Sequence, residues 1–252
     1  MSTNTKAVTF EHKSSAAING EAANTKAAAL TAPALLHLLH LSSPALPIGA
    51  YAYSQGLEYA IDSGQLNNTH DIADWLTGVL SEGMANLDCP LLIRSYTAWQ
   101  QQNYAAINHW NNYLRACRET SELLLEDEQL GIALSRLLND LGLPVTAIQC
   151  LQEKPCFAVM FALAGSHWQI PLYDLLHSFT YSWLENQVAA ATKIVPLGQT
   201  AAQKLLIQLL PVIPQAIAHA QQVADDELGL SLPGQVMASS LHEYQYSRLF
   251  RS

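Results

Sequence analysis

The stretch PALLHLLHLSSP, residues 33–44, has the apolar spacing and the end signals of a helix, and other segments with helix signals follow it along the chain. Pro33 suits the first turn of a helix, where its missing N–H would have no partner in any case. The leucines after it form a broad apolar stripe at helical spacing, and Pro44 stops the helix because the residue before a proline avoids the helical backbone conformation. This stretch therefore predicts an amphipathic helix with a defined start and end.

Further segments of this kind follow, each bounded by proline, glycine or an N-cap residue. We expect helices at about residues 53–63, 69–86, 90–102, 104–117, 121–141, 145–165, 171–195, 200–210 and 212–224, and a short one from residue 233. Leu and Ala dominate the composition, and both lose little side-chain freedom in a helix. The sequence therefore predicts an all-α, single-domain bundle of about ten helices.

Three parts of the chain are expected to differ in their order. Residues 1–30 have no apolar periodicity, which predicts a disordered leader. Residues 31–232 form the helical body, and residues 233–252 form a C-terminal partner-binding helix and tail. The tail is aromatic and basic where the body is acidic, and we expect it to be disordered in the free protein and helical in a complex.

Charged residues make up 13% of the chain, against about 25% in an average soluble domain. This deficit favours a large apolar face that is buried against other proteins. The net charge of −9 excludes nonspecific binding to nucleic acid, which requires Lys and Arg. No CxxC pair or signal peptide is recognisable, and the longest unbroken apolar run, residues 156–165, is about half of a membrane span. We therefore expect a cytoplasmic protein with reduced thiols and no membrane-spanning helix.

The motifs of common enzymes are absent. No Gly-Lys dipeptide occurs, so a phosphate-binding loop is excluded, and GxGxxG, GxSxG and HExxH are missing. His37 and His40 share a helix face at a spacing that Ni²⁺ or Zn²⁺ can use, but their helix holds no Cys, Asp or Glu to complete a site. We therefore predict a protein that is not an enzyme and needs no cofactor, and a small helical metalloenzyme is the least favoured alternative.

An acidic cluster lies at the start of the helix expected over residues 121–141. Its members are Glu119, Glu122, Glu126, Asp127 and Glu128. Carboxylates are favourable near a helix N-terminus, so we interpret the cluster mainly as a solvated face, with a partner-binding face as the alternative. Catalytic use is disfavoured because no nearby His or Lys is visible to complement the acids.

Three segments are informative when they are taken together. They are residues 41–58 (LSSPALPIGAYAYSQGLE), residues 115–122 (RACRETSE) with Gly131, and residues 182–187 (SWLENQ) followed by residues 193–199 (KIVPLGQ). In this order and spacing they resemble the urease accessory protein UreF family, and the resemblance covers about residues 35–252.

The resemblance implies a chaperone for nickel insertion into urease. Such a protein is all-helical, dimerises, binds the accessory protein called UreD or UreH, and with it recruits the nickel-carrying GTPase UreG before docking on apo-urease. The main alternative is a direct modulator of GTP hydrolysis by UreG. Whether nickel touches this chain stays open.

The resemblance also assigns residues to partners. The positions that match the family's C-terminal tail, which binds the UreD/UreH-type protein, are His242, Glu243, Tyr244, Tyr246, Arg248, Leu249 and Phe250. Tyr, Phe and Arg are enriched at interface hot spots, which independently favours this role. The alternative is a tail that folds back onto its own domain.

A second group is hypothesised to bind or modulate UreG, and the alternative for its lysine is a solvated side chain without a partner role. Its members are Glu58, Glu185, Gln187 and Lys193. Lys193 is the only Lys or Arg between residues 154 and 204, so it offers an isolated positive charge to a phosphate or carboxylate of the GTPase. An arginine finger from Arg115 or Arg118 is a sharper version of the same hypothesis.

Overall fold

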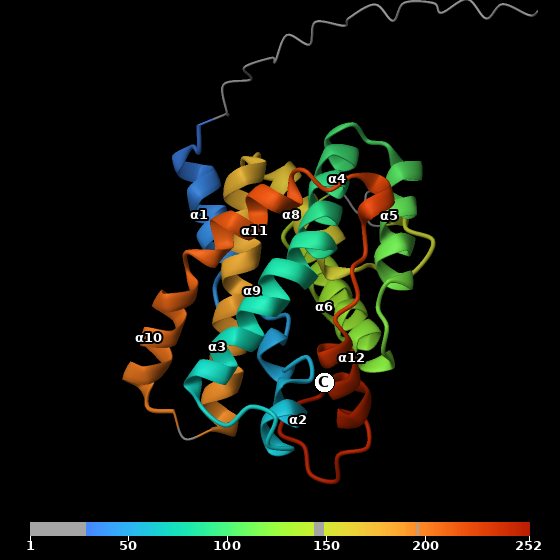
Figure 1. Cartoon of the computed structure of the whole chain (residues 1–252). Helices are drawn as coiled ribbons and strands as arrows, with labels where there is room; N and C mark the ends of the chain where they lie inside the picture. The colour runs from blue at the N-terminus through green and yellow to red at the C-terminus, as the bar shows by residue number, and fades with distance from the viewer. Residues whose placement is uncertain (1–28, 144–148, 196) are drawn as a thin grey trace, which may run out of the picture.

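The computed structural model describes residues 29–143, 149–195 and 197–252, and within them the regular structure is entirely helical. The α-helices are α1 (Ala32–Leu41), α2 (Leu57–Asp62), α3 (Thr69–Gly78), α4 (Asp88–Gln100), α5 (Tyr104–Ala116), α6 (Ser121–Asp140), α8 (Phe157–His167), α9 (Leu172–Ile194), α10 (Gln199–Leu209), α11 (Val212–Ala220) and α12 (Pro233–His242) (Figure 1). The expected all-α bundle is confirmed. The leader expected at residues 1–30 lies, up to residue 28, outside the described residues.

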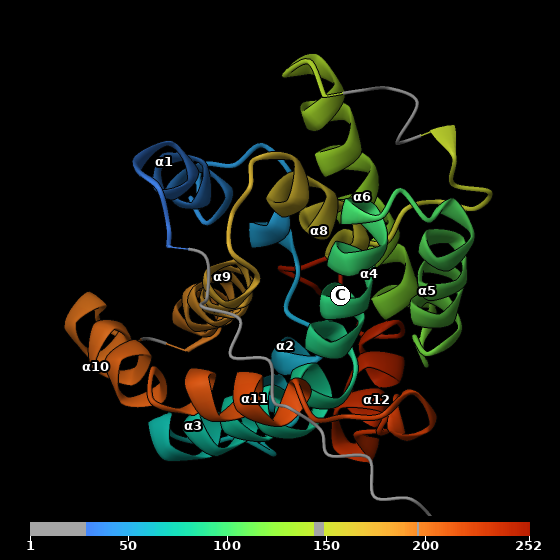
Figure 2. The ribbon, with the colours of Figure 1, turned by 90° about the horizontal axis from the view of Figure 1, so that it is seen from above.

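Helix α8 lies in the core because all of its faces are apolar. Every residue from Ala158 to Gly165 is buried, and α8 packs against α4, α6 and α9. The longest helix, α9, spans 23 residues; Figure 2 shows it end-on, with α1 above it and α10 at its lower left. These central helices form one continuous core on which the shorter helices are placed.

The helix expected at residues 53–63 begins only at Leu57. Gln55 and Gly56 precede it with φ angles of 54° and 83°, in the left-handed region that favours glycine. A Cβ on Gly56 would lie 2.8 Å from the backbone nitrogen of Ser239 in α12. Gly56 therefore permits both the sharp start of α2 and the close approach of α12.

Two other expected helices are interrupted. The one expected at residues 69–86 is α-helical to Gly78 and continues as a π-helix over Val79–Met84. The one expected at residues 145–165 falls partly on residues 144–148, outside the described residues, and residues 151–156 separate that part from α8, which begins at Phe157. The backbone N–H groups of Cys156 and Phe157 are bound there by the side chains of Asn111 and Asp127, at 2.8 and 2.7 Å.

Residues Gln199–Ala220 are long and apolar enough to cross a membrane by length and composition alone. The chain divides this stretch at Leu210 and Pro211 into α10 and α11. Leu205, Ile213 and Ile217 are buried in the core. The expected break at a proline is confirmed, but each of the two helices has one buried face and one exposed face.

The C-terminal segment returns to the body after α12. Helix α12 packs against α2 and α6, and the following segment, dark red in Figure 1, loops back so that its end lies beside α2 and α12. This return brings the tail onto the acidic start of α6.

Candidate partner-binding site

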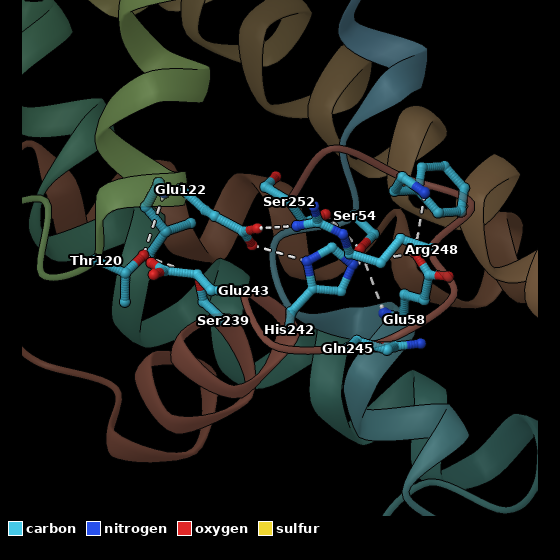
Figure 3. A network of polar contacts seen from close by, with 12 residues as sticks. Ser54, Glu58, Thr120, Glu122, Ser239, His242, Glu243, Gln245, Arg248 and Ser252 are labelled. Carbon is cyan, nitrogen blue, oxygen red and sulfur yellow. Dashed lines mark hydrogen bonds and ion pairs between the residues drawn. The ribbon is translucent and has the colours of Figure 1, made fainter.

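His242, the last residue of α12, lies between two buried carboxylates (Figure 3). Its Nδ1 is 2.8 Å from Oε2 of Glu122 on α6, and its Nε2 is 3.1 Å from Oε2 of Glu58 on α2. The imidazole is 0% exposed, and the two carboxylate side chains are 8% and 3% exposed. Three helices that are distant in sequence are thus joined by one ring.

The same two carboxylates hold the tail. Oε1 and Oε2 of Glu58 accept the backbone N–H groups of Leu249 and Phe250, at 2.7 and 2.9 Å. Oε1 of Glu122 accepts Nη1 of Arg248 at 2.8 Å. Each of the four carboxylate oxygens is therefore within hydrogen-bond distance of a tail donor or of a ring nitrogen of His242. We call Glu58, Glu122, His242 and Arg248 the anchor cluster.

Three further hydrogen bonds fix the end of the tail. The backbone N–H and Oγ of Ser54 donate to the carbonyl oxygen of Ser252, at 2.7 and 2.6 Å, and Oγ of Ser252 donates to Oε2 of Glu126 at 2.7 Å. The buried ring of Phe250 lies under Lys193 of α9, whose Nζ is 5.3 Å from the ring centroid. The tail is therefore bound to the loop before α2, to α6 and to α9.

Glu126 links the tail to a cavity. Burial raises the pKa of Glu126 to about 7, while hydrogen bonds from Ser252 and Gln55 and the charge of Arg118 oppose this rise. Gln55 donates to Oε1 of Glu126 at 2.8 Å and accepts Nε1–H of Trp183 at 2.9 Å. The cavity beside this chain of hydrogen bonds measures about 140 Å³.

The other acids of the cluster are paired with basic side chains. Arg118 binds Asp88 and Asp127, and Glu128 binds Arg115 at 2.6 Å and Lys154 at 2.7 Å. The interpretation as a solvated face is therefore wrong for all but Glu119, which remains exposed. The statement that no His or Lys complements the acids is also wrong, because His242 and Lys154 reach them from distant parts of the chain.

This pairing bears on the arginine-finger hypothesis. The side chains of Arg115 and Arg118 are only 19% and 17% exposed, and both are held by carboxylates of their own chain. Neither guanidinium is presented to a partner in this conformation.

The expectation of a disordered tail in the free chain is not what the structure shows. The segment after His242 is non-helical but tied down by the contacts above, so it folds back onto its own domain in part. His242 and Phe250 point inward, and Glu243 accepts a hydrogen bond from Oγ of Ser121. Tyr244, Tyr246 and Leu249 point outward, with 85%, 105% and 67% exposure respectively.

The residues assigned to UreG do not form one surface. Glu58 and Gln187 are buried, each 3% exposed, and Glu185 is half-buried, where it accepts the hydroxyl of Tyr181 at 3.2 Å. Lys193 is exposed, with Nζ 5.6 Å from the ring centroid of Tyr51. Glu58, assigned to UreG, instead contacts the tail, which was assigned to a different partner.

Sequence reasoning missed the pairing of Glu58 and Glu122 with the tail, and the roles of Ser54, Gln55 and Ser252. The run of acids at helical spacing showed that partners were needed, but nothing in the sequence said which of the few basic residues supplied them. Only the return of the chain after α12 decides this.

The histidines of α1 are not arranged around an ion. The ring of His37 stacks on Trp168, with centroids 4.5 Å apart. Among the residues that the structure describes, no three His, Cys, Asp or Glu side chains are grouped so that they can hold a metal ion.

Comparison with known proteins gives a consistent family. The family model described as UreF matches residues 66–210. The urease accessory protein UreF of Teredinibacter turnerae is 57% identical over 218 residues, covering 86% of this chain and 98% of the relative. The UreF proteins of Hahella chejuensis and Alkalilimnicola ehrlichii are both 48% identical, over 219 and 215 residues, covering 87% and 85% of this chain and 98% and 94% of the relatives. The chain therefore belongs to the UreF family of urease accessory proteins.

Proposed function

We propose that this chain is a cytoplasmic chaperone for nickel insertion into apo-urease. It acts by binding, and bridges a UreD/UreH-type protein and the GTPase UreG in a GTP-dependent maturation complex. Nickel is the cargo of that complex and not a resident cofactor of this chain. Family membership supports the role in urease maturation, and the outward side chains of the tail support the bridging step.

The tail is the proposed contact for the UreD/UreH-type protein. Tyr244, Tyr246 and Leu249 expose large apolar surfaces, while the anchor cluster holds the chain at His242 and again at Arg248, Leu249 and Phe250. Met237 and Leu241 extend this exposed surface onto α12, with 63% and 43% exposure. Tyrosines on a fixed backbone bind at low entropic cost, which favours a protein interface.

Lys193 is the proposed contact for UreG, and it also supports the second candidate function, direct modulation of GTP hydrolysis. It is the exposed positive charge beside Tyr51, itself 65% exposed, at the edge of the tail. A single lysine in this position can meet a carboxylate or phosphate of the GTPase without an arginine finger.

The proposal includes a homodimer. Helix α1 exposes Leu36 and Leu39 at 68% and 58%. A groove lined by Leu38, Leu39, Tyr181, Leu210 and Ile213 lies beside them. An apolar strip next to a groove is the arrangement that a second copy can cover.

Co-purification with the UreD/UreH-type protein tests the tail assignment. The triple variant Tyr244→Ser, Tyr246→Ser, Leu249→Ser should lose about 100-fold or more in affinity, because hot-spot side chains dominate binding energy. The control variant Tyr104→Ser, Leu141→Ser changes residues that are 44% and 51% exposed on α5 and beside α6, and should bind as the unchanged chain does. Equal binding by both variants would remove the tail from the proposal.

A further inference from the structure

The contacts of His242 fit a ring that carries two protons. Both ring nitrogens lie within hydrogen-bond distance of a carboxylate oxygen, at 2.8 and 3.1 Å. A neutral imidazole has one N–H, so its other nitrogen would direct a lone pair at a carboxylate oxygen. The tail also donates to Glu58 and Glu122, as expected for acids that are ionised. The arrangement therefore fits an imidazolium between two carboxylates.

Charge balance inside the anchor cluster depends on that proton. With His242 charged, the two carboxylates are matched by His242 and Arg248; without the proton, one negative charge is left over at a site where three of the four side chains are nearly inaccessible. An uncompensated buried charge is strongly unfavourable.

Among the residues that the structure describes, the other groups that face this region are not placed to replace the proton. Facing this region, α6 also contributes Glu126, which binds Ser252, and α2 contributes Asp62, which Gln245 approaches at 3.5 Å. Helix α9 contributes Lys193, placed over the ring of Phe250. Glu243, next to His242, binds Ser121. Asp62 and Glu243 add to the negative charge, Glu126 does so above its raised pKa of about 7, and Lys193 contacts a ring instead of the carboxylates.

We propose that His242 is a positioning residue that holds residues 248–250 only while it is protonated, so that the tail is a proton-dependent latch. The oxygens that meet His242 belong to the same carboxylates that bind Arg248 and the amides of Leu249 and Phe250. Deprotonation makes Glu58 and Glu122 repel one another across the ring, and the tail detaches as they separate and hydrate.

The direction of the pH dependence follows from proton counting. The latched state binds one proton more than a released state in which His242 is exposed and neutral, so latching weakens as pH rises. Over the pH range in which this proton is lost, the equilibrium constant for latching, the ratio of latched to released tail, falls by up to about tenfold per pH unit. This inference rests on the proposed function only where it extends to the partner: the latch fixes Tyr244, Tyr246 and Leu249 for binding.

Hydrogen exchange on the full chain tests the latch without a partner. Protection factors of the Leu249 and Phe250 amides, taken relative to an unstructured peptide at each pH from 6 to 10, should fall with rising pH. Amides of Phe161 and Leu163 in the core are the internal reference and should not follow this fall. In the same samples, ¹⁵N spectra of the His242 ring should show two protonated nitrogens while the tail is protected. A neutral ring together with a fully protected tail would overturn the proposal.

Two variants separate His242 from its surroundings. His242→Gln cannot gain a proton, so tail protection should be low and independent of pH. Glu128→Gln alters another buried carboxylate of α6, which contacts Arg115 and Lys154 and not the tail, and should keep the pH-dependent fall. The same fall in His242→Gln as in the unchanged chain would contradict the latch. If His242→Gln does not fold, the ring spectra of the unchanged chain decide the question alone.

Affinity for the UreD/UreH-type protein separates the latch from the proposed function. If the affinity is higher at pH 6 than at pH 9 and falls over the same pH range as the tail protection, both the latch and the proposed partner interface are supported. A latch that titrates without any change in affinity contradicts the pre-organisation of the interface and leaves the latch itself standing. Binding that needs Tyr244 and Tyr246 while tail protection is independent of pH supports the interface and overturns the latch.

Discussion

Two buried carboxylates, those of Glu58 and Glu122, make most of the polar contacts that hold the tail. Glu58 accepts two backbone N–H groups and approaches His242, and Glu122 joins His242 to Arg248. Buried charges that lose one partner are destabilising, so these residues act as a group and not as separate pairs.

Glu126 gives a pH prediction of definite sign. Its pKa is raised to about 7 by burial, so between pH 4.5 and 7 the folded chain keeps a proton that the unfolded chain has lost. The free energy of unfolding therefore falls with rising pH in this window, by at most about 3 kcal/mol from this group. Glu126→Gln should make the decrease in the free energy of unfolding between pH 5 and pH 8 smaller by this amount, as measured by urea unfolding at the two pH values.

Glu128 is the matched control, with the opposite sign. Burial alone would raise its pKa, but hydrogen bonds from Lys154 and Arg115 lower the pKa below its usual value. Its stabilisation is therefore present at neutral pH and lost as the solution becomes acidic. Glu128→Gln should destabilise the chain at pH 7 and lose that effect toward pH 3. If Glu126→Gln showed the same pattern, the assignment of a raised pKa would be wrong.

Lys193 distinguishes a modulator from a passive scaffold. Lys193→Ala should change the rate of GTP hydrolysis by UreG about fivefold or more, in the range of typical coupling between sites, while the complex still co-purifies. Lys204→Ala removes another exposed lysine, on the neighbouring helix α10, and should leave the rate unchanged. If Lys193→Ala abolishes the complex, Lys193 acts in binding and not in modulation. If the complex forms and the rate of GTP hydrolysis is unchanged, Lys193 has neither role.

At the scale of helices, close approach of backbones decides where α6 and α8 meet. A Cβ at Gly131 of α6 would collide with the backbone carbonyl of Pro155, just before α8 begins. Gly131→Ala should therefore lower the free energy of unfolding by about 1–3 kcal/mol, the usual cost of overpacking.

Gly78 is the control for that substitution. It has a helical φ of −60° and open space around the position of a Cβ. Gly78→Ala should stabilise the chain by up to about 1 kcal/mol, because alanine is the better helix former. Chemical denaturation measures both effects. If the two substitutions lower the free energy of unfolding equally, the effect of Gly131→Ala does not come from the close backbone contact at that position.

At the scale of the molecule, the exposed leucines of α1 predict self-association. The unchanged chain should sediment as a dimer at micromolar concentration, and Leu36→Asp with Leu39→Asp should give a monomer, because carboxylates in an apolar interface are costly to desolvate. Leu125→Asp with Leu141→Asp replaces leucines that are each 51% exposed elsewhere, and should remain a dimer. If the unchanged chain is a monomer, the proposed dimer interface does not exist. If only the control pair gives a monomer, the interface lies at Leu125 and Leu141 instead.

Local patterns in the sequence were sufficient for most of the helices. The proline at the start of α1, the Asn68 cap of α3 and the apolar run of α8 act within a few residues, and the structure contains all three features. The start of α2 was missed because Gln55 has a positive φ, which few non-glycine residues adopt.

The family and the helical class were therefore determined by the sequence itself, because helix periodicity and caps are local and the three family segments are contiguous. The anchor cluster was decided only by the tertiary structure. Glu58, Glu122 and His242 are separated by many tens of residues, and any of the acids had several possible basic partners. Their pairing is fixed by the packing of α12 against α2 and α6, which places His242 and the tail where the carboxylates are buried and must be neutralised.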